Sequence, residues 1–172
     1  MSLYSASVPV YVQLLSSMQT ILDKTIAQVA ARKLEQATIL NDRLYPDMFP
    51  FARQVQAVCD HAAGSCVRVA GGEYAIPPRD ETTLEQLKER VAKALASVQG
   101  VTEAQIDAGA SKDVSFPMGP RSVTMRGDNY MLHFAFPNFY FHLTTAYDIL
   151  RHRGFEVGKR DFLGKIPGFP AA

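Results

Sequence analysis

Several features are scarce or missing in this sequence, and each scarcity excludes a class of protein. The chain of 172 residues has no tryptophan and 2 cysteines, so a framework of several disulfides does not hold the fold together. Its 18 Lys and Arg residues nearly balance 17 Asp and Glu residues, which leaves a net charge of +1. Such a chain has no overall field that attracts nucleic acid or an anionic membrane. We therefore expect neither kind of partner.

Long apolar runs are also missing. The segment 129–147 has no Asp, Glu, Lys or Arg, but Asn, His, Thr and Pro interrupt it. This composition predicts a buried helix rather than a membrane span. No Lys or Arg precedes Lys24, whereas a secretory signal begins with positive charge. We therefore expect a cytoplasmic protein. Cys59 and Cys66 lie seven positions apart on one expected helix, ~10 Å along its axis, so both are expected to be free thiols.

The apolar residues that are present recur at helical spacing. With 47% hydrophobic and 20% charged residues, the composition is that of one globular domain over 1–172. Three- and four-residue steps between apolar positions predict four helices. Their expected ranges are 8–31, 51–69, 83–98 and 128–153.

Local signals support the ends of these helices. Ser7 is expected to cap the first helix, with Pro9 in its first turn, and Asp47 is a candidate cap for the second. Thr83 and Gln86 form the pattern of a capping box at the third. In the last helix Pro137 has no amide proton to donate, so we expect a kink near its middle.

The remaining segments lack helical periodicity. Residues 113–116 and 121–126 alternate between apolar and polar around a turn-prone Pro-Met-Gly-Pro sequence, which predicts a β-hairpin. Residues 159–172 contain several Gly and Pro and are expected to form coil. The sequence therefore predicts a mainly α fold: a four-helix bundle with a small hairpin before the last helix.

Three local motifs, NDRLYPDMFPFARQV, PNFYFHLTTAYDILRHRG and GKRDFLG, resemble a bacterial family of unknown function. That family lies within the DinB/YfiT-like superfamily of proposed metalloenzymes, and the resemblance covers nearly the whole chain. It implies a four-helix bundle that is often dimeric. Some members of the superfamily are thiol-dependent transferases or isomerases, and others have no known activity.

The resemblance also implies candidate metal ligands. In the wider superfamily a divalent metal is held by one histidine of the second helix and two histidines four residues apart on the last. His61 matches the first, but the last helix has no His-x-x-x-His pair. One alignment places Asn138 and His142 there, and another places Asp148 and His152. With water in an open position, such a set would suit zinc, nickel, iron or manganese.

A structural explanation of the same polar residues needs no metal. His61, Asn138 and His142 would then be hydrogen-bonded to one another and to Thr145. In either case we expect His61 and His142 to face one polar cavity. A second group of residues, Arg151, Arg153, Lys159 and Arg160, is a candidate anion site, although cations also suit the negative end of a helix.

Two functions from different classes remain open at this point. The first is a structural or small-ligand-binding bundle with a polar core site. It would form a homodimer in which Tyr140 and Phe141 are the interface candidates, because the last helix is apolar on more than one face. The second is a divalent-metal-dependent enzyme of the thiol-transferase or hydrolase kind.

Overall fold

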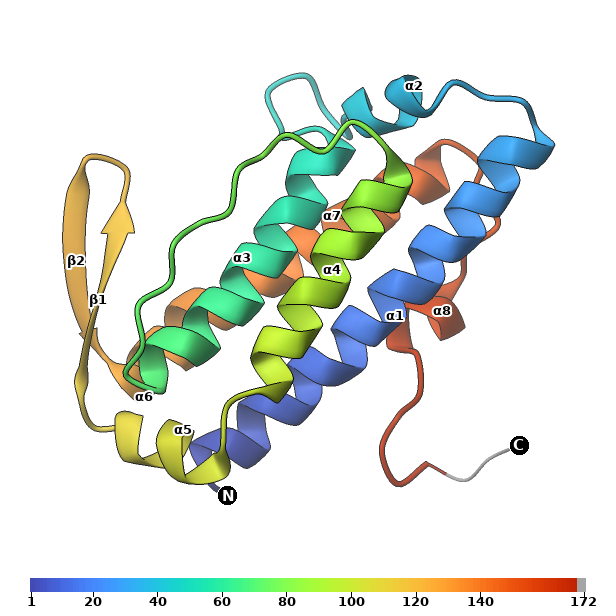
Figure 1. Ribbon diagram of the computed structural model, residues 1–172. Coiled ribbons are helices and arrows are strands. Elements are labelled where there is room, and N and C mark those ends of the chain that lie inside the picture. Colours follow the sequence, from blue (N-terminus) through green and yellow to red (C-terminus); the bar gives the residue numbers. More distant parts are fainter. Residues whose placement is uncertain (170–172) are drawn as a thin grey trace.

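The computed structural model describes residues 1–169, and a four-helix bundle forms its centre (Figure 1). The long helices are α1 (Leu3–Ala31), α3 (Phe51–Val69), α4 (Leu84–Gln99) and α7 (Phe136–His152). A hairpin of β1 (Asp113–Met118) and β2 (Arg121–Arg126) pairs antiparallel, with Phe116 opposite Val123. The mainly α fold with a hairpin before the last helix is thus confirmed.

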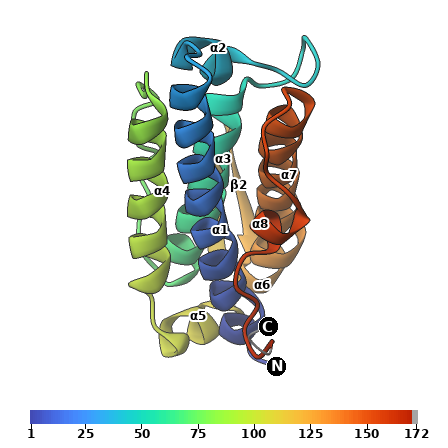
Figure 2. The same ribbon diagram turned by 90° about the vertical axis from the view of Figure 1, so that its right-hand side faces the viewer.

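The four long helices pack in a fixed order around the core. Helix α4 packs against both α1 and α3, and α3 also packs against α7. The view turned by 90° shows α1 between α4 and α7, with α8 (Lys159–Leu163) beside α1 and in front of α7 (Figure 2). In residues 1–169, no helix combines the length and the apolar character that crossing a membrane requires.

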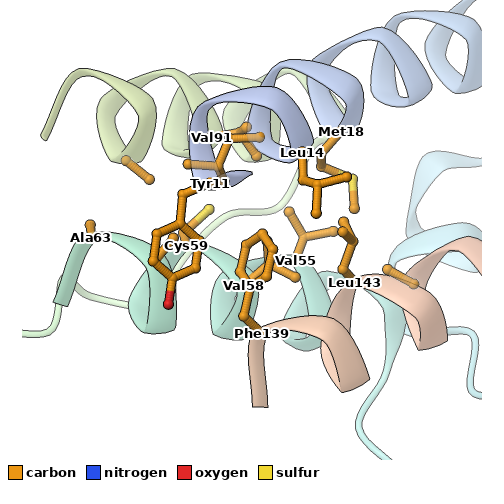
Figure 3. Close-up of a cluster of buried hydrophobic side chains, with 14 of the residues drawn as sticks. Tyr11, Leu14, Met18, Val55, Val58, Cys59, Ala63, Val91, Phe139 and Leu143 are labelled. Carbon is orange, nitrogen blue, oxygen red and sulfur yellow. The ribbon is translucent and has the colours of Figure 1, made fainter. Parts of the chain in front are cut away.

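Apolar side chains from all four helices meet in the core (Figure 3). Tyr11 of α1 lies against the ring of Phe139 of α7, with ring centroids 4.8 Å apart. Leu87, Val91 and Leu143, which the periodicity assigned to the core, are fully buried. Cys59 and Cys66 are buried free thiols, and burial raises the pKa of Cys66 to about 12. These cysteines therefore act as apolar packing residues.

The first helix begins earlier than its sequence signals indicate. Ser2, not Ser7, is the N-cap of α1, and its side chain accepts a hydrogen bond from the backbone of Ser5. The hydroxyl of Ser7 instead donates to the carbonyl of Leu3, and Pro9 lies inside the helix. Asp47 does not cap α3, because Pro50 occupies the cap position without a side-chain hydrogen bond.

Three short helices lie where the sequence predicted none. They are α2 (Gln36–Asn41), α5 (Glu103–Gly109) and α8. Helix α5 has its own capping box, formed by Thr102 and Gln105, so this pattern was present but the segment is too short to show periodicity. Helix α8 replaces part of the expected coil over 159–172; residues 170–172 lie outside the described part.

The expected last helix is divided into three parts. The short α6 (Gly127–Asn129) leads into a π-helical segment, η1 (Tyr130–Ala135), and then into α7. Pro137 lies in the first turn of α7, where its missing amide proton costs nothing. The wider turn of η1 changes the register before Pro137. Leu132, seven positions before the buried Phe139 and thus on its stripe in an unbroken helix, is therefore exposed.

Residues 71–83 connect α3 to α4 without regular structure, and we call this segment the strap. It runs along the outside of the bundle from one end of α3 to the start of α4 (Figure 1). Tyr74 of the strap fits against α3 because position 64 is glycine: a Cβ there would lie 3.0 Å from the Tyr74 ring. The strap is thereby seated directly on the helix that carries His61.

Candidate functional site: a histidine pair between α3 and α7

His61 of α3 and His142 of α7 lie beside each other where these two helices pack. Their ring centroids are 5.6 Å apart, and their planes differ by 12°. His142 is 8% exposed, whereas His61 is half-buried and reaches solvent. The ring of Phe134 lies 5.9 Å from that of His61, and the ring of Phe49 lies 6.0 Å from that of His142. The site is therefore a pair of imidazoles with aromatic walls.

Gln54 fixes the hydrogen position on His142. Its amide nitrogen donates to the carbonyl of Phe49 at 3.0 Å, so its amide oxygen faces the imidazole. That oxygen lies 2.7 Å from Nδ1 of His142 and can only accept. Nδ1 must therefore carry the proton, and the lone pair on Nε2 is left for another partner.

Both imidazoles are neutral near neutral pH. Burial, followed by the neighbouring His142 and by Arg53 and Arg68, lowers the pKa of His61 from 6.5 to about 4. Burial and then Arg53 lower the pKa of His142 to about 4 as well, against an opposing effect of Asp60. A neutral imidazole has one nitrogen that accepts a hydrogen bond or binds a metal.

Arg53 is the cation that lowers the pKa of both histidines. Its guanidinium lies over the ring of Phe49, 4.9 Å from the centroid, and its Nη1 is 3.8 Å from a carboxylate oxygen of Asp60. Within residues 1–169 this buried Nη1 has no hydrogen-bond partner. Asp60 is meanwhile hydrogen-bonded to Arg90 at 2.9 Å. The site thus contains a positive group with an unused donor.

The other residues expected at the pair have different partners. The amide nitrogen of Asn138 donates to the carbonyl of Phe134 at 2.7 Å, and the hydroxyl of Thr145 donates to the carbonyl of Phe141. Both bonds reach the carbonyl four residues earlier in the chain, a partner to which short polar side chains on helices bond readily. The expected hydrogen-bond network of His61, Asn138, His142 and Thr145 is therefore replaced by one between His142 and Gln54.

Sequence reasoning missed Gln54 as a site residue, although a signal was present. Gln54 precedes His61 by seven positions, close to two helical turns, so both share one face of α3. A polar residue in that stripe would need a buried partner, and Gln54 is 1% exposed.

The alternative metal pair lies elsewhere. Asp148 is half-buried and His152 is exposed at the end of α7, where His152 lines a separate pocket of ≈ 360 Å³ with Arg153 and Phe155. In the part of the chain that the structure describes, no three His, Cys, Asp or Glu side chains are grouped as metal ligands. The pair therefore offers a metal ion two histidine nitrogens and nearby amide groups. Water or a bound ligand would have to fill most of its other coordination positions.

The candidate anion residues are partly occupied by protein partners. Arg153 forms two hydrogen bonds to the carboxylate of Asp42, at 2.5 and 2.6 Å. Arg151 donates to the carbonyl of Phe155 at 3.2 Å. Lys159 and Arg160 are exposed in the first turn of α8. The four cations therefore have no contact in common that would make them one anion site.

Comparisons of the sequence and the fold with known proteins identify a family. The model of the family described as a domain of unknown function, DUF1993, matches residues 3–163. The crystal structure of a DinB family member protein from Shewanella denitrificans is similar, with 36% identity and a TM-score of 0.85. That match covers 99% of this chain and 96% of the other. A search of curated proteins gives no match. The chain therefore belongs to the DUF1993 family, within the DinB-like superfamily.

Proposed function

We propose that this protein is a small-ligand-binding bundle whose ligand contacts His61 and His142. The observation that carries the proposal is the pair of imidazoles with centroids 5.6 Å apart, one of them with its Nε2 lone pair left free by Gln54. Buried polar side chains that serve only structure are normally bonded to other protein groups. A half-buried histidine beside a second neutral one instead suits recognition of a molecule from solvent.

The surroundings favour a small organic acid with a flat apolar body. Arg53 supplies a buried donor without a hydrogen-bond partner within residues 1–169, and a carboxylate is a planar acceptor that matches a guanidinium. The rings of Phe49 and Phe134 supply aromatic surface on either side of the histidines. Such a ligand would place its carboxylate near Arg53. A proton taken up from solvent on binding would then be shared between the carboxylate and the histidine pair.

Calorimetric titration with benzoate, and with benzyl alcohol as its uncharged counterpart, tests this proposal. We expect benzoate to bind, and to bind more tightly as the pH falls, because the bound anion favours protonated histidine. His61→Phe should weaken benzoate binding about tenfold, a change of ~1.4 kcal/mol. His152→Gln, which alters an exposed histidine outside the pair, is the matched control. Equal binding of benzyl alcohol, or no effect of His61→Phe, would contradict the proposal.

A divalent metal ion at the same pair is the second candidate. The bond from His142 to Gln54 favours it, because histidine ligands usually donate their second ring nitrogen to an oxygen acceptor. An ion would supply Lewis-acid chemistry or hold a thiolate, and His61 and His142 would be its protein ligands. Titration of chelator-stripped protein with zinc or nickel decides between the candidates. Stoichiometric binding that His142→Ala abolishes would favour the metal, and its absence would favour the organic acid.

We also propose that the protein forms a homodimer through the outer face of α7. Phe141 is 56% exposed and Tyr140 is 41% exposed on this helix. The exposed ring of Phe49 adds to the apolar surface near the histidine pair. Clustered apolar side chains of this size on a surface are typical of protein contacts.

A further inference from the structure

A second cavity lies on the opposite flank of α3 from α7, between the strap and α4. Its volume is ≈ 450 Å³, within the range of pockets that bind small organic molecules. Cys59 and Ala63 of α3 line its floor, Ala94 of α4 lines one wall, and Pro77 and Pro78 of the strap line the other. The strap therefore forms a wall of this pocket as well as a connection between helices.

Buried charges hold this wall in place. The guanidinium of Arg90, whose side chain is 6% exposed, donates to the carbonyl of Pro78 and to the carboxylate of Glu81, both at 2.7 Å. It also donates to Asp60 at 2.9 Å, and Gln56 donates to Glu81 at 2.8 Å. Because Pro78 and Glu81 belong to the strap, Asp60 and Gln56 to α3, and Arg90 to α4, these bonds join the strap to both helices. The pocket is thus formed before any ligand binds.

The charges that line the pocket are unequal. Three carboxylates line it, those of Asp80, Glu81 and Glu89, against the two cations Arg90 and Lys93. Glu81 is paired with Arg90, and Glu89 is paired with Lys93 at 2.8 Å. The neighbouring Arg79 is directed to Asp60, at 3.5 Å. Asp80 is therefore the carboxylate in excess, exposed at the rim.

We propose that this strap pocket binds a small organic ammonium ion with an apolar body. The apolar body would contact Ala63, Pro77 and Ala94, and the ammonium group would lie at the rim beside Asp80. The ring of Tyr74 also lines the pocket. Its π system attracts cations, and the guanidinium of Arg68 lies over it, 5.3 Å from the centroid. Burial raises the pKa of Tyr74, so its hydroxyl stays neutral, and it donates a hydrogen bond to Asp60 at 3.5 Å.

A series of three probes that differ in charge tests this proposal: phenethylamine, phenethyl alcohol and hydrocinnamate. NMR shifts of the methyl groups of Ala63 and Ala94 report binding inside the pocket. We expect phenethylamine to bind with a dissociation constant of about 1 mM, as suits so small a ligand. Hydrocinnamate should shift these methyl groups least. Equal or tighter binding of hydrocinnamate, or no shift at either alanine with millimolar phenethylamine, would overturn the proposal.

Two variants and a control separate the pocket from other sites. Asp80→Asn should weaken phenethylamine about threefold, which is the usual scale for an exposed ion pair. Ser97→Leu, which enlarges an exposed side chain of α4 at the pocket, should abolish binding. Asp47→Asn alters an exposed carboxylate outside the pocket and should change nothing. If Asp47→Asn weakens binding as much as Asp80→Asn, the proposal fails, whatever the outcome of the benzoate titration at the histidine pair.

Discussion

Gln54 determines which nitrogen of His142 is available, because its amide is held at both ends. Its nitrogen donates to Phe49 and its oxygen accepts from His142. With 1% of its surface exposed, Gln54 has no access to water as a substitute partner. A change at this position therefore acts on the site through the hydrogen position of a neighbour rather than through direct contact with a ligand.

Replacing Gln54 by Leu is expected to lower the free energy of unfolding by about 1–3 kcal/mol, because it leaves Nδ1 of His142 without an acceptor. Urea unfolding measures this loss. Gln56→Leu, which instead breaks the bond to Glu81, is the matched control for the histidine site. It should destabilise the strap without altering the NMR signals of the His142 ring. A Gln54→Leu protein as stable as the original would contradict this role.

The stability of the fold should depend on the histidines in mild acid. The unfolded chain protonates these rings near pH 6.5, whereas the folded chain does so only near a pKa of about 4. Between these values the unfolded state binds more protons, so stability is full above the higher pH and falls as the pH decreases. We expect a loss of about 1–3 kcal/mol between neutral pH and about pH 5.

Urea unfolding across this pH range measures the effect. His61→Phe removes one of the two rings and should reduce the slope, while His152→Gln should leave it unchanged. Stability that is constant from neutral pH to about pH 5 would show that the rings are not held neutral by the fold.

At this scale the sequence allowed the two histidines to be named but not their partners. His61 follows from the resemblance and His142 from its spacing in the motif, and the structure brings the rings together. Asn138 has the spacing of a ligand, but a short amide on a helix bonds to its own backbone. Helical spacing predicts the side of the helix on which a side chain lies. Its hydrogen-bond partner depends on the residues of the helix that packs against that side.

The strap is the element whose stability depends most on a single residue. Arg90 joins it to α3 through Asp60 and fixes its last part through Pro78 and Glu81. Removing one partner of a buried ion pair leaves the other charges desolvated and uncompensated. The strap therefore depends on electrostatics, whereas the four long helices depend on apolar packing.

Arg90→Met is expected to destabilise the protein by about 3 kcal/mol and to increase amide hydrogen exchange in the strap. Hydrogen-exchange mass spectrometry measures the second effect directly. Lys93→Met, which breaks the exposed pair with Glu89, should leave the stability nearly unchanged, because solvent screens exposed ion pairs. Equal protection of the strap in Arg90→Met and in the original protein would contradict this explanation.

The long helices were predictable because the apolar residues of a half-buried helix recur about every 3.6 positions. Helices α3 and α4 begin within one residue of the expected positions. The strap, α8 and η1 were not predictable, because tertiary contacts define them. Helix α8, for example, is held by Ser17, whose hydroxyl donates to the carbonyl of Phe162 at 2.6 Å. A contact between residues so far apart leaves no periodic pattern.

For the whole molecule, the proposed dimer is the feature with the clearest physical signature. Sedimentation at micromolar concentration should give a species of about twice the chain mass of 19.0 kDa, since an interface of standard size persists there. Phe141→Lys should yield a folded monomer, because that side chain is exposed in the single chain. Leu132→Lys, at another exposed position before α7, is a control for added charge. A species of chain mass from the original protein would rule out the dimer.

The central claim is that His61 and His142 form a pair of neutral imidazoles available to a ligand. A long-range proton–nitrogen NMR correlation spectrum of the histidine rings at neutral pH tests it most directly. We predict that both rings are neutral, that His142 carries its proton on Nδ1, and that benzoate shifts the free Nε2 signal. A protonated ring at neutral pH, or a proton on Nε2 of His142, would contradict the claim.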